Sequence, residues 1–541
     1  MTAAADAGPA RRAVRRFVLA TSVPPLLHAY RGVYGAVTWL AVRIFRRYPA
    51  VRAVYLTRGS AKGEILPLVS DVDFLVIHEG LTARDRAELM KAYDGLSRAT
   101  RLLDSHIQLL DDAWFRRQIE LDDHFRLRFA EGRATWKLVH GRDYVRQLPA
   151  PDRDALDPGL LAETKVWWGL FAWRLFGPRR HSAETVTRNN VCYKAVSECM
   201  KAMDGITRRR LTFSRADALR AARDALAPSG RALVERLEAL QARRFRPRDP
   251  RIIEDTTAFL LERLDRFYGE LEAHPLARRA TEAPVRVDAP AGEEPFGPAA
   301  VDDARRLVGS IEREWGGALM GAHLVTGVHF SPDELVLLLA ADPSRPPSLE
   351  LMQRAFALHQ AHAPTARHRI RLFLLLAAAA FQLDPDDLEK SWQSILWRPG
   401  NPDAFALAAM PERCLLGTPL AASAPPAWTV LIRDFLAAEE VAFAHLLADP
   451  AVYKLGNRDF LRVFWKTAQI VAINRAAAPG GEIVYPLTPR AVARALAAQA
   501  TPLPRALEPL LAAMESAGAG AEPDLAELVP GAIGYLGEIR T

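Results

Sequence analysis

Two short apolar runs stand out near the beginning of the chain, at residues 54–56 and 74–77. Both are rich in β-branched and aromatic side chains and are bounded by turn residues, which predicts two strands. Residues 82–100 place apolar side chains three and four positions apart, which predicts a helix. The run at residues 102–110 predicts a further strand, and residues 155–272 favour helices throughout.

Pro, Ala and charged residues dominate residues 273–300, and this composition predicts a linker between two halves of the chain. Short motifs of the first half return after it in the same order. Residues 331–338 are similar to residues 70–77, and residues 370–376 predict another strand. The pattern indicates an internal repeat, and an unrelated helical domain stays open as the alternative.

The composition is that of a globular protein, because 50% of the 541 residues are hydrophobic and 25% are charged. No apolar run of the sequence is long enough to span a bilayer. We see no signal peptide, and the three cysteines have neither metal-ligand nor disulfide spacing. We therefore expect a cytoplasmic protein.

The charge is divided unequally along the chain. Residues 1–280 contain 49 Lys and Arg against 34 Asp and Glu, a net charge of +15, whereas the rest contains 22 against 30, a net charge of −8. A basic half would attract a triphosphate or another polyanion. Alternatively, the two halves complement each other. The first half begins with an apolar segment, residues 36–45, that we expect to pack on its own domain, with a membrane or partner surface as the alternative.

A pair of acids opens the second predicted strand. Asp71 and Asp73 are two residues apart, so in an extended chain their side chains face the same way. Two carboxylates on one face repel each other unless a cation lies between them, and oxygen ligands suit Mg²⁺ or Mn²⁺. The first strand runs into Gly59-Ser60, where backbone N–H groups can approach a phosphate. An Asp-x-Asp alone is more often a turn or helix cap, but the flanking strands favour a metal and phosphate site.

This arrangement resembles the nucleotidyltransferase superfamily that includes DNA polymerase β and the aminoglycoside nucleotidyltransferases. Its pattern is an apolar strand, Gly-Ser, a spacer of about ten residues and Asp-x-Asp opening a second strand. The resemblance covers roughly residues 50–145 and implies an α/β (α+β) fold with a small mixed sheet. It also implies transfer of a nucleoside monophosphate from a nucleoside triphosphate, with Asp71 and Asp73 as catalytic metal ligands and Gly59 and Ser60 at the phosphates.

The resemblance also implies a third carboxylate on the strand at residues 102–110. Asp104 is the only acid on the face that it shares with His106 and Gln108. His106 could serve as a base in its place, or be a hydrogen-bonded strand histidine without a role. We also predict phosphate contacts from Lys62, Ser70 and Lys194, although a lysine such as Lys194 can equally bury only its stem.

The expected organisation is a duplicated architecture with a degenerate second copy, in which Pro332 stands over Asp71 and Glu334 over Asp73. The first half comprises an N-terminal helical segment (1–50), a nucleotidyltransferase domain (51–148) and a helical bundle (149–272). The linker (273–300) leads to a degenerate nucleotidyltransferase-like domain (301–424) and a second helical domain (425–541).

The predicted function is Mg²⁺-dependent nucleotidyl transfer from a nucleoside triphosphate to a hydroxyl or amine, with a small-molecule acceptor favoured. Nucleic acid stays open as a partner, and the sequence does not define the acceptor or the oligomeric state. The alternative is a catalytically inactive protein of the same fold that binds nucleotide or RNA. A basic run, Arg243, Arg244, Arg246 and Arg248, would serve that alternative or be a solvated face.

Overall fold

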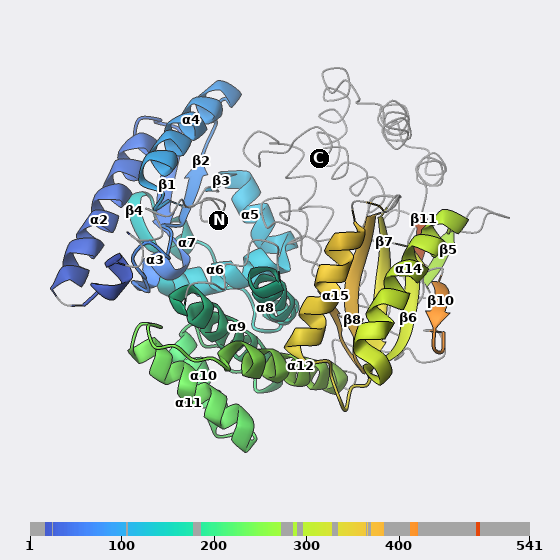
Figure 1. The fold of residues 1–541 in the computed structure, drawn as a ribbon. Coiled ribbons are helices and arrows are strands. Elements are labelled where there is room, and N and C mark those ends of the chain that lie inside the picture. Colours follow the sequence, from blue (N-terminus) through green and yellow to red (C-terminus); the bar gives the residue numbers. More distant parts are fainter. Residues whose placement is uncertain are drawn as a thin grey trace, which may run out of the picture. The chain divides into compact units, whose positions relative to one another are not determined.

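The computed structural model describes residues 14, 17–23, 25–103, 107–176, 185–271, 285–288, 296–326, 334–363, 365, 369–383, 412–419 and 483–486. Contacts divide these residues into two compact units. The first holds the described residues up to 167 together with 185–253, and the second holds 168–176 and the described residues from 254 onward. Helices and strands of both units are labelled in Figure 1.

The first unit combines a small sheet with helices. Its strands are β1 (Val51–Leu56), β2 (Phe74–His78), β3 (Gln108–Asp111) and β4 (Lys137–Gly141). Its helices up to β4 are α2 (Leu26–Phe45), α3 (Arg58–Lys62), α4 (Ala83–Thr100), α5 (Asp112–Leu121) and α6 (Asp123–Thr135). Those that follow are α7 (Tyr144–Gln147), the 3₁₀ turn η1 (Asp154–Leu156), the first part of α8 (Asp157–Phe176), α9 (Thr185–Thr207), α10 (Arg215–Arg223) and α11 (Pro228–Ala242).

The sheet of the first unit has the order β3-β2-β1-β4. β1 is antiparallel to both neighbours, while β2 and β3 are parallel and are joined through α4. The strands predicted at 54–56 and 74–77 and the helix predicted at 82–100 are confirmed. The strand predicted at 102–110 is shorter, because only 108–111 form β3, while Leu103 makes an isolated bridge with Val72.

The core of this sheet lies under α2 and α4, which contact each other along one face (Figure 1). Phe45, Phe74 and Tyr93 pack their rings together there, with centroids 5.4 to 6.5 Å apart. Burying three aromatic side chains of this size contributes several kcal/mol, of order 2 kcal/mol each. The expectation that the segment at 36–45 packs on its own domain is confirmed for one face of α2, where Val37, Ala41 and Phe45 are buried.

The second unit contains α12 (Ile252–Glu270), whose first two residues belong to the first unit, and α14 (Pro298–Trp315). The 3₁₀ turn η4 (Gly316–Ala318) leads into β6 (Leu319–Thr326), β7 (Glu334–Ala341), α15 (Leu349–His362), β8 (Arg369–Leu375), β9 (Ala380–Gln382) and β10 (Glu412–Leu416). These strands form a sheet with the order β10-β6-β7-β8-β9. The strand predicted at 370–376 is confirmed as β8.

The two sheets share strand order and direction. In the second sheet β6 is antiparallel to β7 and β10, as β1 is to β2 and β4 in the first. β7 is parallel to β8 and is joined to it through α15, as β2 is joined to β3 through α4. Gly141 is the last residue of β4, and Gly417 directly follows β10; both have φ +83°. Gly141 lies beside Arg52, and Gly417 lies beside Met320. The register of the strand pair is irregular at the neighbouring position in both sheets.

When the two sheets are aligned at these glycines and register irregularities, the second-sheet residue that corresponds to Asp73 differs from the one expected from the sequence. Phe74 pairs with Leu56 in the first sheet, and Leu337 pairs with Leu324 in the second. Val336, which is fully buried, therefore stands over Asp73, rather than Glu334 as the sequence echo suggested. The second sheet has no carboxylate at the Asp73 position.

The described residues of the expected linker include regular secondary structure. Residues 285–288 form a strand, β5 (Val285–Asp288), which pairs in parallel with β11 (Ile483–Pro486), and α14 begins at Pro298. β11 is the part that the structure describes of the predicted second helical domain at 425–541, and it is a strand. The domain boundaries predicted from the sequence stay predictions. Among the described helices, none combines the length and apolarity that crossing a bilayer requires.

Candidate functional site

The loop between β1 and β2 brings the Gly-Ser pair against the two acids. Thr57 N–H donates to the Asp73 carbonyl over 3.1 Å and closes the loop at its base. The Ser60 hydroxyl donates to the Asp71 carbonyl at 3.0 Å and accepts from the Asp73 N–H at 3.2 Å. Ser60 is itself buried. Its hydroxyl therefore acts as a latch that fixes the backbone of both aspartates.

The burial of residues 71–73 indicates that both carboxylates face away from the core. Val72 between them is 1% exposed, and its N–H donates to the Leu102 carbonyl at 2.8 Å. Because side chains alternate along an extended chain, Asp71 and Asp73 project away from the core that holds Val72. Both aspartates are half-buried. The geometry thus supplies two oxygen donors at one edge of the sheet.

Arg58 is a part of this loop that the sequence reasoning missed. It has φ +51°, a left-handed conformation that costs an L-residue about 1–2 kcal/mol. Its guanidinium Nη1 lies 3.4 Å from the Asp73 Oδ1, and the arginine side chain is 53% exposed. Gly59 was expected to provide the freedom of this turn, but the left-handed positions are Arg58 and Gly63, at φ +73°. A cation on a strained residue therefore already faces one of the acids.

The other predicted phosphate contacts have different neighbours. Lys62 forms a close ion pair with Glu131 and donates to the Phe213 carbonyl at 2.8 Å. The Ser70 hydroxyl accepts from the Leu66 N–H at 3.0 Å within the loop. Lys194 is half-buried on α9. Asp104 and His106 lie outside the described residues, so the third catalytic position stays a prediction.

A buried group of ion pairs adjoins the loop, and sequence reasoning did not find it either. Four acids and four bases from α3, the turn after it, α6, α8, α9 and α10 take part: Glu64, Glu131, Glu163, Glu198, Lys62, Arg128, Lys201 and Arg215. Arg128 lies 3.0 Å from Glu131 and 2.7 Å from Glu163. Arg215 lies 2.8 Å from Glu198 and makes a close ion pair with Glu64, so α10 is tied directly to the turn after α3.

The ion pairs keep these buried groups charged. Burial would raise the pKa of Glu131, but Lys201, Arg128 and Lys62 outweigh it and lower that pKa to about 2. Burial works in the opposite direction on Lys201, yet Glu198, Glu131 and Glu163 raise its pKa. The sequence signals these ion pairs only through the three-residue spacing of Arg128 with Glu131 and of Glu198 with Lys201. Ion pairs on exposed helix surfaces have the same spacing, so it does not identify a buried group.

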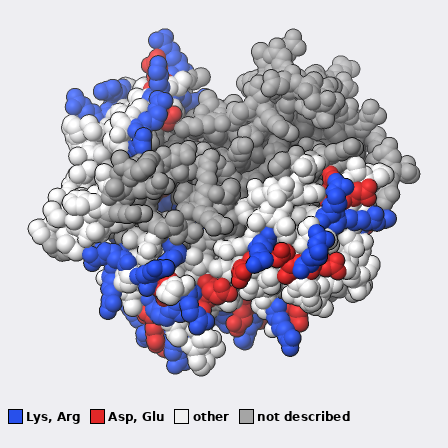
Figure 2. Space-filling model, in the orientation of Figure 1, with Lys and Arg blue, Asp and Glu red and all other residues white. Residues whose placement is uncertain are grey.

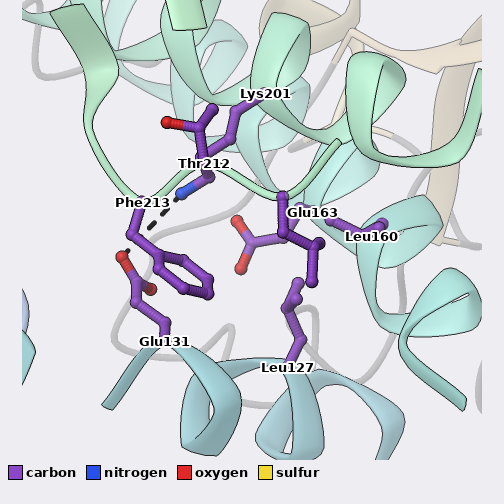
Figure 3. Close-up of a pocket in the computed structure, with 8 residues that line it drawn as sticks. Leu127, Glu131, Leu160, Glu163, Lys201, Thr212 and Phe213 are labelled. Atoms are coloured by element: carbon purple, nitrogen blue, oxygen red, sulfur yellow. Dashed lines mark ion pairs between the residues drawn. The ribbon is translucent and has the colours of Figure 1, made fainter. Parts of the chain in front are cut away.

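A small pocket lies within this group, as Figure 3 shows. Its lining comes from α6, α8, α9 and the segment before α10: Leu127, Glu131, Leu160, Glu163, Lys201, Leu211, Thr212 and Phe213. Lys201 lies 3.9 Å from Glu131 across it. The cavity volume of about 10 Å³ suits one water molecule. None of the lining residues belongs to the loop of Asp71 and Asp73, and a cavity of this size is too small for a nucleotide.

Comparison with known proteins gives a weak structural likeness. No protein-family profile matches the chain, and no curated protein matches its sequence. Among solved structures, the chain is similar to a spectinomycin adenyltransferase from Enterococcus faecialis determined with ATP and spectinomycin, at 11% identity and a TM-score of 0.30. The match covers 41% of this chain and 97% of that one. So low a score leaves the functional inference to the chain's own residues.

Proposed function

We propose that the protein is a Mg²⁺-dependent nucleotidyltransferase that moves a nucleoside monophosphate from a nucleoside triphosphate to a small-molecule hydroxyl or amine. The observation that carries this proposal is the Ser60 latch, which binds the Asp71 carbonyl and the Asp73 N–H and so fixes the backbone of both aspartates directly before β2. A structural loop needs no second carboxylate on the same face, whereas a metal and phosphate site does.

The donor set fits a magnesium ion. Asp71 and Asp73 offer hard oxygen ligands, and Arg58 shows that a positive group is accommodated at Asp73. When bound, the metal would neutralise charge on the triphosphate and orient it. Mn²⁺ would suit the same ligands.

The chain's own residues would hold the donor for in-line attack. Backbone N–H groups around Gly59 would face the phosphates, and Arg58 is placed to exchange its contact with Asp73 for one with a phosphate oxygen. The acceptor oxygen or nitrogen forms a bond to the α-phosphorus, and the bond from that phosphorus to the bridging oxygen breaks, so that pyrophosphate leaves. The acceptor's proton passes to a base, for which Asp104 and His106 stay candidates.

We further propose that the second sheet is a duplicate of the first that has lost the site. The shared strand order, the glycines at φ +83° and the matching register irregularities support common descent. Val336 at the position of Asp73 is buried and apolar, so this copy offers no equivalent metal ligand.

Pyrophosphate release from each nucleoside triphosphate, measured across a panel of small-molecule acceptors with Mg²⁺ or Mn²⁺, tests the proposal. Asp73→Asn is the control variant, because it keeps the shape of the side chain and removes its charge. We expect release that depends on one class of acceptor and is absent in the variant. Nucleotide binding without release, surviving loss of both aspartates, would instead support a regulatory nucleotide-binding protein.

A further inference from the structure

Three potential metal ligands meet in the second sheet, away from the aspartate pair in the sequence. β6 carries His323, and β10 carries Glu412 and Cys414, two residues apart and so on one face. Cys414 pairs directly with His323 in the strand register. The His323 Nδ1 lies 2.8 Å from the Glu412 Oε1, and one ligand atom of each residue lies within 4.8 Å of the others.

The corresponding positions of the first sheet hold no such ligands. There Tyr55 pairs with Leu138, and the Tyr55 ring packs against Trp136, two residues before Leu138, at 6.2 Å. The architecture thus accepts an apolar group at this point. In the second sheet this point holds a histidine that is 2% exposed, bonded to the Glu412 carboxylate, and a thiol that lies 3.5 Å from the Leu416 carbonyl and 3.4 Å from the Gly417 carbonyl.

Gly321 provides the space for the histidine ring. A Cβ at this position would lie 2.9 Å from the His323 Nε2, whereas the matching residue of the first sheet is Ala53. The Glu412 carboxylate, in turn, fixes the orientation of the ring. These details describe a position shaped around His323 rather than an accidental meeting of polar side chains.

We propose that His323, Glu412 and Cys414 bind a divalent transition metal, with Zn²⁺ as the ion that this nitrogen, oxygen and sulfur set suits best. Three protein ligands leave one tetrahedral position for water or a substrate atom.

The test is a Co²⁺ titration of the full chain after chelator treatment, followed by displacement with Zn²⁺. We expect one equivalent of Co²⁺ with a thiolate-to-metal charge-transfer band, which Zn²⁺ abolishes. Cys414→Ser and His323→Gln should lose the band and weaken Zn²⁺ binding by at least about tenfold. Cys192→Ala, at a buried cysteine elsewhere, should retain both.

The outcome is independent of nucleotidyl transfer, because neither readout uses a nucleotide. No charge-transfer band in the wild type, or an equal band in Cys414→Ser, would overturn the metal site. Circular dichroism of each variant separates loss of a ligand from loss of the fold, and a folded Cys414→Ser that binds Zn²⁺ like the wild type would also reject it.

A separate surface, on α2, carries a second inference. Of the ten large hydrophobic side chains that are exposed among the described residues, seven fall between residues 14 and 40: Val14, Phe17, Val23, Leu26, Val33, Trp39 and Leu40. The left edge of the molecule in Figure 2, where α2 runs in Figure 1, is correspondingly drawn mainly white. Trp39 is 58% exposed on the side opposite the core residues Val37 and Ala41.

The charges that this segment itself carries have one sign. Its described part, residues 17–50 without residue 24, contains four arginines and no acid. Arg43 lies over the Trp39 ring at 5.5 Å, and Arg46 and Arg47 follow the end of the helix. A protein partner would have to supply all the complementary acids, whereas an anionic lipid surface presents them with apolar chains beneath.

We infer that the exposed side of α2 lies on an anionic bilayer, with Leu26, Val33, Trp39 and Leu40 inserted at the headgroup boundary. The helix would lie along the surface and not cross it. Each buried large side chain contributes about 1.5–3 kcal/mol, and each arginine near the surface about 1 kcal/mol.

Co-sedimentation with vesicles tests this surface without reference to activity. We expect binding to phosphatidylcholine vesicles that contain phosphatidylglycerol, little binding to phosphatidylcholine alone, and loss of binding in high salt. Trp39→Ser with Leu40→Ser should abolish sedimentation, whereas Met320→Ser, at an equally exposed side chain in the other unit, should not. Equal sedimentation of the variant, or a dimer in solution that the same variant disrupts, would reject the bilayer.

Discussion

Replacing Glu131 with glutamine tests whether the buried ion pairs hold the helices against the loop between β1 and β2. Glu131 is 5% exposed and faces Lys62, Arg128 and Lys201. Glutamine preserves the shape of the side chain but leaves these cations without their shared counter-charge. Removing one partner of a buried pair typically costs about 3–5 kcal/mol, and we expect a loss in this range at neutral pH.

The same carboxylate predicts how stability responds to acid. Its pKa is about 2 in the folded protein against an ordinary value of 4.5, so the folded state favours the ionised form. The resulting stabilisation, about 3 kcal/mol, is complete above pH 4.5 and is lost as the pH falls toward 2. Glu131→Gln lacks this group, so its stability should fall less steeply across that window.

Hydrogen exchange of the amides in α6 and α9 measures the effect at neutral pH within one unit of the chain, which matters because a protein of this size need not unfold in one step. We expect exchange roughly 150- to 5,000-fold faster in Glu131→Gln, which is the loss of about 3–5 kcal/mol converted at 1.36 kcal/mol per tenfold. Tryptophan fluorescence during acid titration measures the pH dependence. Glu88→Gln, which removes a solvent-exposed pair with Arg84, should change neither readout. An unchanged exchange rate in Glu131→Gln would refute the reasoning.

Three further outcomes follow from the loop and the sheet. Ser60→Ala should weaken binding of the Mg²⁺-nucleotide by about tenfold in calorimetry while melting within a few degrees of the wild type, because it removes the latch on two aspartates and little core packing. Arg58→Gly should raise the melting temperature by relieving about 1 kcal/mol of strain and yet lower kcat/KM; a variant with unchanged kcat/KM would exclude Arg58 from the site. Gly141→Ala should destabilise the first sheet by more than about 2 kcal/mol in urea unfolding, because its Cβ would lie 1.9 Å from the Arg52 carbonyl oxygen. Wild-type stability of this variant would contradict so close an approach of the two strands.

The features that sequence reasoning recovered are those encoded locally. Alternation around Val72 predicted Asp71 and Asp73 on the face away from the core, and in the structure Val72 is buried between two half-buried aspartates. The apolar spacing at residues 82–100 predicted a helix, and α4 spans Ala83–Thr100. Each of these rests on residues within a few positions of one another.

What escaped prediction depends on tertiary neighbours. The strain at Arg58 arises because the chain must turn between Thr57, which is hydrogen-bonded to Asp73, and the buried Ser60. No residue type in the sequence indicates this strain. The ion pairs around Glu131 join helices that are distant in the sequence, so each member resembles an ordinary surface charge. The pairing of His323 with Cys414 likewise requires the strand register.

The central claim is that Asp71 and Asp73 together bind a divalent metal with a triphosphate. Electron paramagnetic resonance of Mn²⁺, titrated into the protein with a non-hydrolysable nucleoside triphosphate, measures this directly and needs no knowledge of the acceptor. The account predicts that wild-type protein immobilises Mn²⁺ only when the nucleotide is present, and that Asp71→Asn and Asp73→Asn each abolish the signal change. Immobilisation that persists in both variants would contradict it.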